Sequence, residues 1–220
     1  MQVASKHAPL DRDAARSSGA APSRSAGHAG RIGPNAIIRV AEALDARVGS
    51  DVTAELFRAA GLSAYLGHLP EDMVREEDVA ALQAQLRVTL RAALRSEIVR
   101  DAGLRTGDYL LARRIPHAAQ AVLKLLPPAL AARILARAIG RHAWTFAGSG
   151  MFLCEPGPPM TFSIVRCPLC RRIRADAPAC DYYAATFERI FQTLVRRRTR
   201  VVETACQAAG AAACRFEIRW

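Results

Sequence analysis

The sequence predicts an α+β fold in which a helical N-terminal half packs on a small antiparallel sheet. From about residue 35 to residue 139, apolar residues recur every three or four positions, which is the period of an amphipathic helix. From residue 144 onward, short segments rich in aromatic and β-branched residues alternate with proline and glycine. An order of helices first and strands later, with one further helix among the strands, is typical of α+β proteins.

The N-terminal half is expected to hold the helices. Residues 1–32 are mainly Ala, Ser, Gly, Arg and His, a composition typical of a disordered tail. Two helices are predicted over about 35–48 and 52–60, because a glycine follows each apolar run. A long helical run is predicted from about Glu76 to Arg114, and its two glycines, four residues apart, indicate close packing against a neighbour. Two short amphipathic helices follow between residues 118 and 139.

The C-terminal half is expected to form the sheet. Residues 144–153 and 161–165 flank a run of three prolines and a glycine, so we expect a hairpin. Residues 181–195 have the apolar spacing of a helix, and residues 200–203 and 214–219 are predicted to be strands on either side of Gly210. A chain of this length can bury one substantial core, so a single domain is expected over residues 33–220.

The charge of the chain indicates an acidic partner. The formal net charge is +11, and all basic residues other than Lys6 and Lys124 are arginine or histidine. Arginine binds carboxylates through two parallel hydrogen bonds, so a carboxylate-bearing small molecule fits as well as an anionic lipid. Basic runs at residues 171–174 and 196–200 come without any nucleic-acid-binding motif, so no nucleic-acid partner is predicted.

The location of the protein is predicted from two negative observations on the sequence. No stretch of about 18 apolar residues is free of charge, so no transmembrane segment is expected. Residues 1–30 lack the apolar region of a secretory signal, which favours the reducing cytoplasm. In that setting, clustered cysteines are more often metal ligands than disulfides.

Three of the six cysteines and one glutamate have the spacing of a metal site. Cys180 precedes a predicted helix, Glu203 ends a strand, Cys206 lies in the following turn and Cys214 begins the last strand. Three thiolates and one carboxylate can complete a tetrahedral shell around a divalent ion. Because this shell leaves no open position, we predict a structural zinc that stabilises the C-terminal part of the chain.

Alternatives to this ligand set stay open. Cys167 and Cys170 form a C-x2-C pair, which together with Cys206 and Cys214 would make a rival four-cysteine site. The same pair could be a redox couple or two cysteines in a loop. The four predicted ligands could equally be inert buried cysteines beside a surface carboxylate. The role of Cys154 is unknown.

A ligand-binding site is predicted at His142, Trp144 and Phe146. A histidine among aromatic side chains can ligate the central metal of a planar macrocycle while the rings stack on it. The alternative is a hydrogen-bonded histidine beside core aromatics. The sequence has no G-x-G-x-x-G motif after a strand and no P-loop, so no nucleotide site is recognised and no catalytic residue is assigned.

Cys180, residues 201–206, Gly210 and residues 214–218 together form a pattern that is typical of one known domain. On these residues, the C-terminal segment resembles the vinyl-4-reductase domain, a small-molecule-binding module related to the Bet3-like fold. In members that sense aromatic compounds, three Cys and one Glu hold zinc, and the corresponding positions here are Cys180, Glu203, Cys206 and Cys214. The resemblance therefore implies a structural zinc at those four residues.

Three further segments carry a more specific similarity, and they are residues 140–150, 167–170 and 181–188. They are similar to the bacteriochlorophyll 4-vinyl reductase family of purple phototrophs, and the mass of 23.8 kDa also agrees. The similarity implies binding of a divinyl protochlorophyllide-type tetrapyrrole in bacteriochlorophyll biosynthesis, as a reductase component or substrate carrier. It also implies other enzymes of that pathway as partners, with a location in the cytoplasm or at the periphery of the photosynthetic membrane.

Whether the chain is an enzyme stays open, because the family name implies a reductase but the sequence offers no site for a hydride donor. The alternative function is a zinc-containing small-molecule sensor or assembly module without enzymatic activity. The sequence is also compatible with a homodimer.

Overall fold

The computed structural model describes residues 30–220, and most of the predicted tail, residues 1–29, lies outside the described residues. The part of the predicted tail that is described belongs to a small sheet. Arg31–Ile32 (β1) pairs antiparallel with Val74–Arg75 (β2), and the Ile32 side chain is buried.

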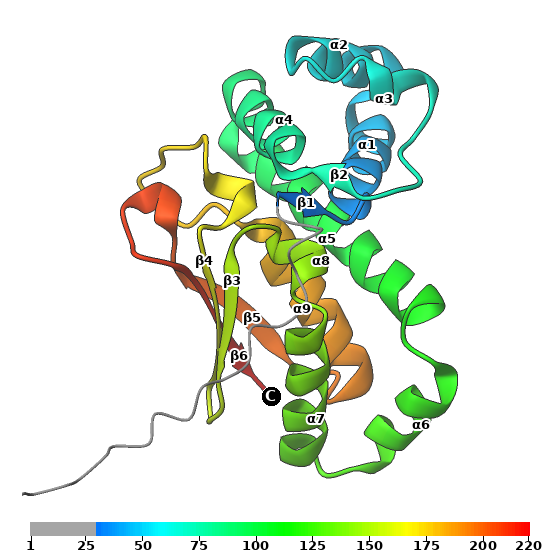
Figure 1. Ribbon diagram of the computed structural model, residues 1–220, viewed down its shortest axis with the longest axis vertical. Coiled ribbons are helices and arrows are strands. Elements are labelled where there is room, and N and C mark those ends of the chain that lie inside the picture. The colour runs from blue at the N-terminus through cyan, green and yellow to red at the C-terminus, as the bar shows by residue number, and fades with distance from the viewer. Residues whose placement is uncertain (1–29) are drawn as a thin grey trace, which may run out of the picture.

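The described chain contains nine α-helices. They are α1 (Asn35–Val48), α2 (Ser50–Ala59), α3 (Ala64–Gly67), α4 (Glu76–Thr89), α5 (Ala92–Arg113), α6 (His117–Leu125), α7 (Pro128–Arg141), α8 (Trp144–Ala147) and α9 (Asp181–Leu194). Figure 1 shows α2 and α3 at one end of the molecule and the α6–α7 pair at the other. None of the helices within residues 30–220 combines the length and the apolarity that crossing a bilayer requires.

The helical half differs from the prediction at one place. The run predicted from Glu76 to Arg114 is two helices, α4 and α5, because Leu90 and Arg91 have extended backbone with ψ of 141° and 147°. Neither a proline nor a glycine marks this break. The change of direction is instead stabilised by packing in the folded molecule, so the local pattern could not predict it.

The second sheet has four antiparallel strands in the order β3-β4-β6-β5. Their bounds are β3 (Met151–Glu155), β4 (Met160–Val165), β5 (Arg200–Ala205) and β6 (Cys214–Arg219). The predicted hairpin is confirmed, but it begins at Met151 and not at Trp144. Residues 144–147 form the short helix α8, and Gly148, with φ of 58°, then reverses the chain before β3.

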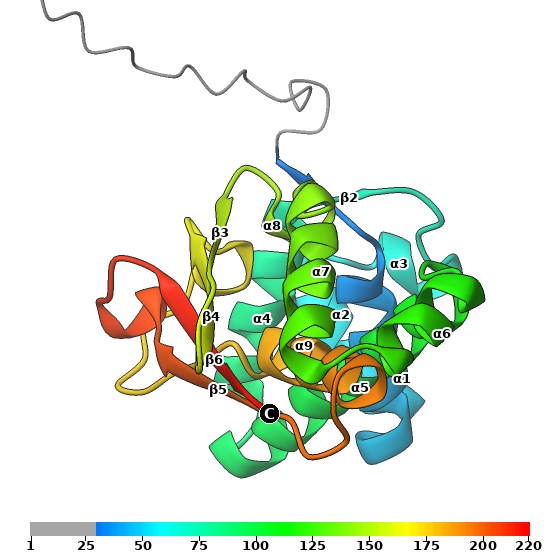
Figure 2. The same cartoon turned by 90° about the horizontal axis from the view of Figure 1, so that it is seen from below.

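Helix α9 lies between the sheet and α5 (Figures 1 and 2). Toward the sheet, Phe187 packs on Phe162 and Phe216 with ring centroids 5.1 and 5.7 Å apart. Toward α5, the predicted close packing at the glycines is confirmed. A Cβ atom at Gly103 would lie 2.4 Å from the Tyr182 carbonyl oxygen, and one at Gly107 would lie 2.7 Å from Arg189 Cβ. Any larger residue would therefore push the two helices apart.

The buried carboxylate of Glu76, at the start of α4, joins three segments. Its Oε2 accepts a hydrogen bond from the Ser149 backbone N–H (2.9 Å) and its Oε1 accepts one from Ser149 Oγ (2.7 Å). Arg171, just after the 3₁₀ turn η1 (Pro168–Cys170), forms an ion pair with the same carboxylate. The helical half, the turn before β3 and the loop after β4 are thereby held together.

Candidate metal centre

Five cysteines from four segments of the chain meet at one end of the larger sheet. All five are buried, and they are Cys167, Cys170, Cys180, Cys206 and Cys214. The sixth, Cys154 on β3, is exposed. Buried thiols without disulfide partners in such a group offer several soft ligands to one small volume.

Strand pairing brings the ends of the chain segments together. Ile164 on β4 pairs with Cys214, the first residue of β6, so the chain leaving β4 reaches Cys167 close to that sulfur. Cys180 lies at the N-terminus of α9, and its backbone N–H donates to Glu203 Oε2 over 2.7 Å. The Cys167 N–H donates to Gln207 Oε1 (2.7 Å), which ties the β4 loop to the turn after β5. These strand pairings and backbone hydrogen bonds bring the sulfurs together.

The four predicted ligands come together in the structure. The Sγ atoms of Cys180 and Cys206 are 4.0 Å apart, those of Cys180 and Cys214 are 3.7 Å apart, and those of Cys206 and Cys214 are 3.8 Å apart. Four sulfurs bound to zinc at about 2.3 Å lie roughly 3.8 Å from one another, so the spacing fits zinc. Glu203 Oε1 is buried and has no hydrogen-bond partner among the described residues, which leaves it available as the fourth ligand.

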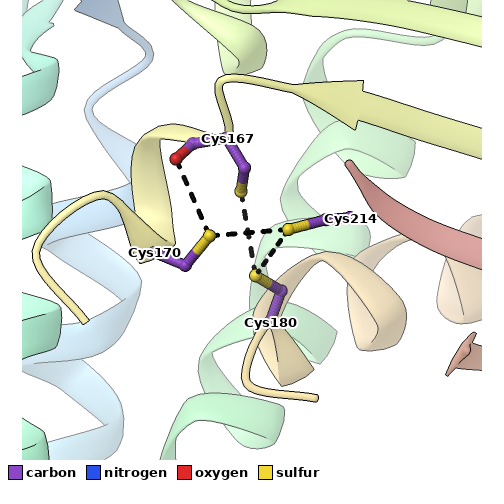
Figure 3. A group of neighbouring side chains, drawn as sticks. All are labelled: Cys167, Cys170, Cys180 and Cys214. Atoms are coloured by element: carbon purple, nitrogen blue, oxygen red, sulfur yellow. Dashed lines mark hydrogen bonds between the residues drawn. The ribbon is translucent and has the colours of Figure 1, made fainter. Parts of the chain in front are cut away.

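The C-x2-C pair also reaches this centre, in a different way from the predicted rival site. Cys167 Sγ lies 3.7 Å from Cys180 Sγ, and Cys170 Sγ lies 3.5 Å from Cys214 Sγ (Figure 3). The second four-ligand group therefore contains Cys180, where the sequence suggested Cys206. Within each of the two groups, all ligand atoms lie within 4.8 Å of one another.

Crowding of ionisable groups perturbs the protonation of this centre. Burial raises the pKa of Glu203 to about 8, although the hydrogen bond from the Cys180 N–H opposes the change. The surrounding sulfurs and burial also raise the pKa of Cys180 above its ordinary value. For Cys206, the neighbouring Cys170 raises the pKa, but hydrogen bonds from Cys180 and Cys214 bring it to about 6. Several adjacent thiolates without a cation would repel one another, so this arrangement favours a bound metal ion.

The three residues predicted to bind an organic ligand differ in their exposure to solvent. His142 is exposed at the end of α7, with its Nδ1 2.9 Å from the Ala138 carbonyl oxygen, and Trp144 is 39% exposed. Phe146 instead packs inward, with its ring centroid 5.4 Å from that of Phe152 and 5.8 Å from that of Phe187. Of the three predicted residues, His142 and Trp144 are therefore exposed, whereas Phe146 packs against core aromatic rings.

A hollow that the sequence did not predict lies beside the cysteines. Its volume is about 750 Å³. Its lining residues are Arg171, Arg172, Ile173, Arg174, Ala175, Asp176, Gln207, Ala208 and Gly210. The arginines stood out in the sequence as a basic run. However, the turn after β5 that closes the other side comes more than 30 residues later, so no local pattern could reveal the hollow.

Comparisons with known proteins agree with this architecture. Residues 160–220 match the vinyl-4-reductase (V-4-R) domain. The "Bacteriochlorophyll synthase 23 kDa chain" of Cereibacter sphaeroides is 45% identical over 189 residues, which is 86% of this chain and 90% of its own. The protein of the same name from Rhodobacter capsulatus is 42% identical over 84% of this chain and 85% of its own.

A solved structure shares the fold at low sequence identity. It is an H-NOX protein from S. oneidensis in the Fe(II)NO ligation state, with a TM-score of 0.50 and 13% identity, covering 86% of this chain and 98% of that chain. This likeness concerns the fold alone. The two relatives match nearly the whole length of the chain, and on that basis the chain belongs to the family of bacteriochlorophyll synthase 23 kDa chains and carries a vinyl-4-reductase domain at its C-terminal end.

Proposed function

We propose that the protein serves bacteriochlorophyll biosynthesis by binding a tetrapyrrole intermediate of the divinyl protochlorophyllide type. The observation that carries this proposal is the 45% and 42% identity to two chains named for bacteriochlorophyll synthesis. The match extends over both the helical half and the vinyl-4-reductase domain. In this role the chain carries its ligand, or presents it to a partner enzyme of the pathway at the periphery of the membrane.

The surface of α7 suits a flat apolar ring that carries a carboxylate. Leu130, Ile134, Arg137 and Arg141 are exposed and follow one another at helical spacing, so they share one face of the helix. The aliphatic pair can contact the ring, and an arginine can bind its carboxylate through two parallel hydrogen bonds. His142 and Trp144 follow at the end of this face, where an imidazole can ligate a central metal ion and an indole can stack.

The experiment is a titration of the protein with divinyl protochlorophyllide, followed by the Soret band and by tryptophan fluorescence. We expect a spectral shift at micromolar protein, and we expect His142→Ala and Trp144→Ala to weaken binding about tenfold each, which corresponds to ~1.4 kcal/mol. His117→Ala, an exposed histidine on α6, is the matched control and should bind normally. No spectral shift with the unmodified protein would refute the proposal.

Two further arms of the titration separate the alternatives. If Arg172→Ala and Arg174→Ala weaken binding while Trp144→Ala does not, the ligand occupies the hollow beside the cysteines and not α7. Adding NADPH tests for turnover: consumption of the vinyl group indicates a reductase, whereas binding without turnover indicates a carrier.

We also propose a structural zinc at Cys180, Glu203, Cys206 and Cys214. Supporting it are the sulfur spacing, which fits tetrahedral zinc, and the buried carboxylate oxygen without a partner among the described residues. The ion would link the start of α9 to both ends of the β5–β6 turn. It would stabilise this part of the fold and leave the ligand-binding surface to other residues.

A further inference from the structure

The two ligand groups at the metal centre share two of their members. One group is Cys167, Cys170, Cys180 and Cys214, and the other is Cys180, Glu203, Cys206 and Cys214. Together they form a set of six ligands, called here the thiolate cluster. Two tetrahedra that share an edge need six corners, and a thiolate sulfur has enough lone pairs to bind two ions at once. We propose that the thiolate cluster holds two zinc ions, bridged by the sulfurs of Cys180 and Cys214.

The sulfur–sulfur distances are compatible with this arrangement. The shared edge, between Cys180 Sγ and Cys214 Sγ, measures 3.7 Å. In the first group, Cys167 Sγ lies 3.7 Å from Cys180 Sγ, and Cys170 Sγ lies 3.5 Å from Cys214 Sγ. In the second group, Cys206 Sγ lies 4.0 and 3.8 Å from the two bridging sulfurs. All these values lie near the roughly 3.8 Å edge of a tetrahedron with Zn–S bonds of about 2.3 Å.

A single ion would leave part of the cluster unused. Bound by the four cysteines of the first group, it would leave Glu203 Oε1 buried without a partner among the described residues. Bound by the second group, it would leave Cys167 and Cys170 as buried thiols 3.5–3.7 Å from sulfurs already committed to the metal. Two ions engage all six side chains, and each ion has four ligands.

The charge of the cluster is compatible with two ions. Five thiolates and one carboxylate carry six negative charges, and two divalent ions would reduce this to two. The remaining charge is offset locally, because the Gln207 N–H donates to the bridging sulfur of Cys214 over 3.4 Å. The other bridging residue, Cys180, lies at the N-terminus of the 14-residue helix α9, where the backbone favours negative charge.

The centre is also held in place from outside the ligands. Cys167 N–H donates to Gln207 Oε1, and Arg171, next to Cys170, pairs with the buried Glu76. The C-x2-C pair is therefore attached both to the β5–β6 turn and to the helical half. The two-ion centre goes beyond the single zinc proposed above, which uses only one of the two groups. It does not depend on tetrapyrrole binding.

The first measurement is metal content of the full chain, purified under reducing conditions from zinc-supplemented cells. Elemental analysis should give two zinc ions per chain. X-ray absorption should show sulfur-rich shells and a zinc–zinc vector of about 3 Å, the separation expected across two bridging thiolates. One zinc per chain without such a vector would overturn the proposal, and so would iron with acid-labile sulfide.

Cysteine variants then show which side chains bind each of the two ions. Cys167→Ser/Cys170→Ser should retain one zinc, and Cys206→Ser should also retain one, each without the zinc–zinc vector. Cys154→Ser changes an exposed cysteine outside the cluster and should retain two. Circular dichroism identifies any variant that fails to fold, and the absorption data on the unmodified chain decide the question independently. Full retention of metal in the Cys167→Ser/Cys170→Ser variant would contradict the proposal.

Discussion

At the residue scale, Glu76 is a buried charge whose hydrogen bonds set its protonation. Burial alone would raise the pKa of this carboxyl, but hydrogen bonds from Ser149 and the pairing with Arg171 hold it below its ordinary value. A carboxyl with a lowered pKa in the folded chain stabilises the fold above its unfolded pKa. That stabilisation is lost as the pH falls through the folded pKa.

Glu76→Gln should therefore destabilise the chain in a pH-dependent way. At pH 7 we expect a loss of about 2 kcal/mol, because the amide cannot accept the same charge-assisted hydrogen bonds. The difference from the unmodified chain should shrink as the pH falls below about 4, because the unfolded carboxyl is then protonated and the folded one follows at lower pH. Urea unfolding at pH 7 and pH 3.5 measures this, and an equal difference at both values would contradict it.

Gly148 faces the same carboxylate and should not tolerate a side chain. Its φ is 58°, and a Cβ would lie 2.1 Å from Glu76 Oε2. Gly148→Ala should cost at least about 3 kcal/mol, since backbone strain and a steric clash add. Gly61→Ala is the control, because Gly61 also has positive φ (74°) but nothing within 4 Å of its Cβ position. Equal losses of stability for Gly148→Ala and Gly61→Ala in chemical denaturation would show that the structure adjusts and relieves the clash at Gly148.

The ligands of the metal centre were only partly predictable at this scale. The spacing of Cys180, Glu203, Cys206 and Cys214 indicated their meeting, because a helix start and the connection between two paired strands bring such positions together. The contacts of Cys167 with Cys180 and of Cys170 with Cys214 were not predictable. It depends on the register that places Ile164 opposite Cys214, and the register is a property of the folded sheet.

At the element scale, the α5–α9 contact is the closest approach between helices described above. Gly103 and Gly107 face the backbone and side chains of α9, and Thr186 Oγ1 donates to the Gly103 carbonyl oxygen over 3.0 Å. Glycine costs a helix roughly 1 kcal/mol relative to alanine, so these positions weaken α5 locally. The close approach of α9 leaves no room for a Cβ atom at either position.

Replacing Gly103 by Ala should separate the effect of close packing against α9 from the effect of helix propensity. The new Cβ would lie 2.4 Å from the Tyr182 carbonyl oxygen, so we expect a loss of about 2–3 kcal/mol despite the better propensity. Gly140→Ala on α7 is the matched control, because its Cβ would meet Phe152 at an ordinary 3.7 Å. That variant should be neutral or more stable by up to ~1 kcal/mol in thermal or urea unfolding.

Elements with their own sequence signals were predicted well, and those fixed by tertiary contacts were not. Apolar spacing identified α9, and proline and glycine identified the β3–β4 turn. The break at Leu90 has no such signal. Residues 144–147 are aromatic and resembled a strand, yet they form α8, where Phe146 packs against Phe152 and Phe187. Aromatic residues suit either state, and packing decided between them.

At the scale of the whole molecule, the proposed metal centre lies where the sheet, α9 and the loop bound to Glu76 meet. Metal removal should therefore destabilise the whole chain and not a single loop. We expect a strong zinc chelator to lower the Tm by about 10 °C or more, since loss of a few kcal/mol shifts a domain of this size by that amount. Calorimetry of the loaded and chelated chain tests this, with zinc-saturated chelator as the control. An unchanged Tm after verified metal loss would contradict it.

The contact between α5 and α9 also bears on where this protein can be divided. The match to the vinyl-4-reductase domain begins at residue 160, yet Gly103 and Gly107, on which α9 packs so closely, lie before that border. We therefore expect that the segment matching the vinyl-4-reductase domain does not fold alone. A chain of residues 160–220 should give the circular dichroism of an unfolded peptide, whereas residues 30–220 should fold. A fusion or insertion at residue 160 would interrupt a unit that folds cooperatively, although the start of the domain match there suggests a domain boundary.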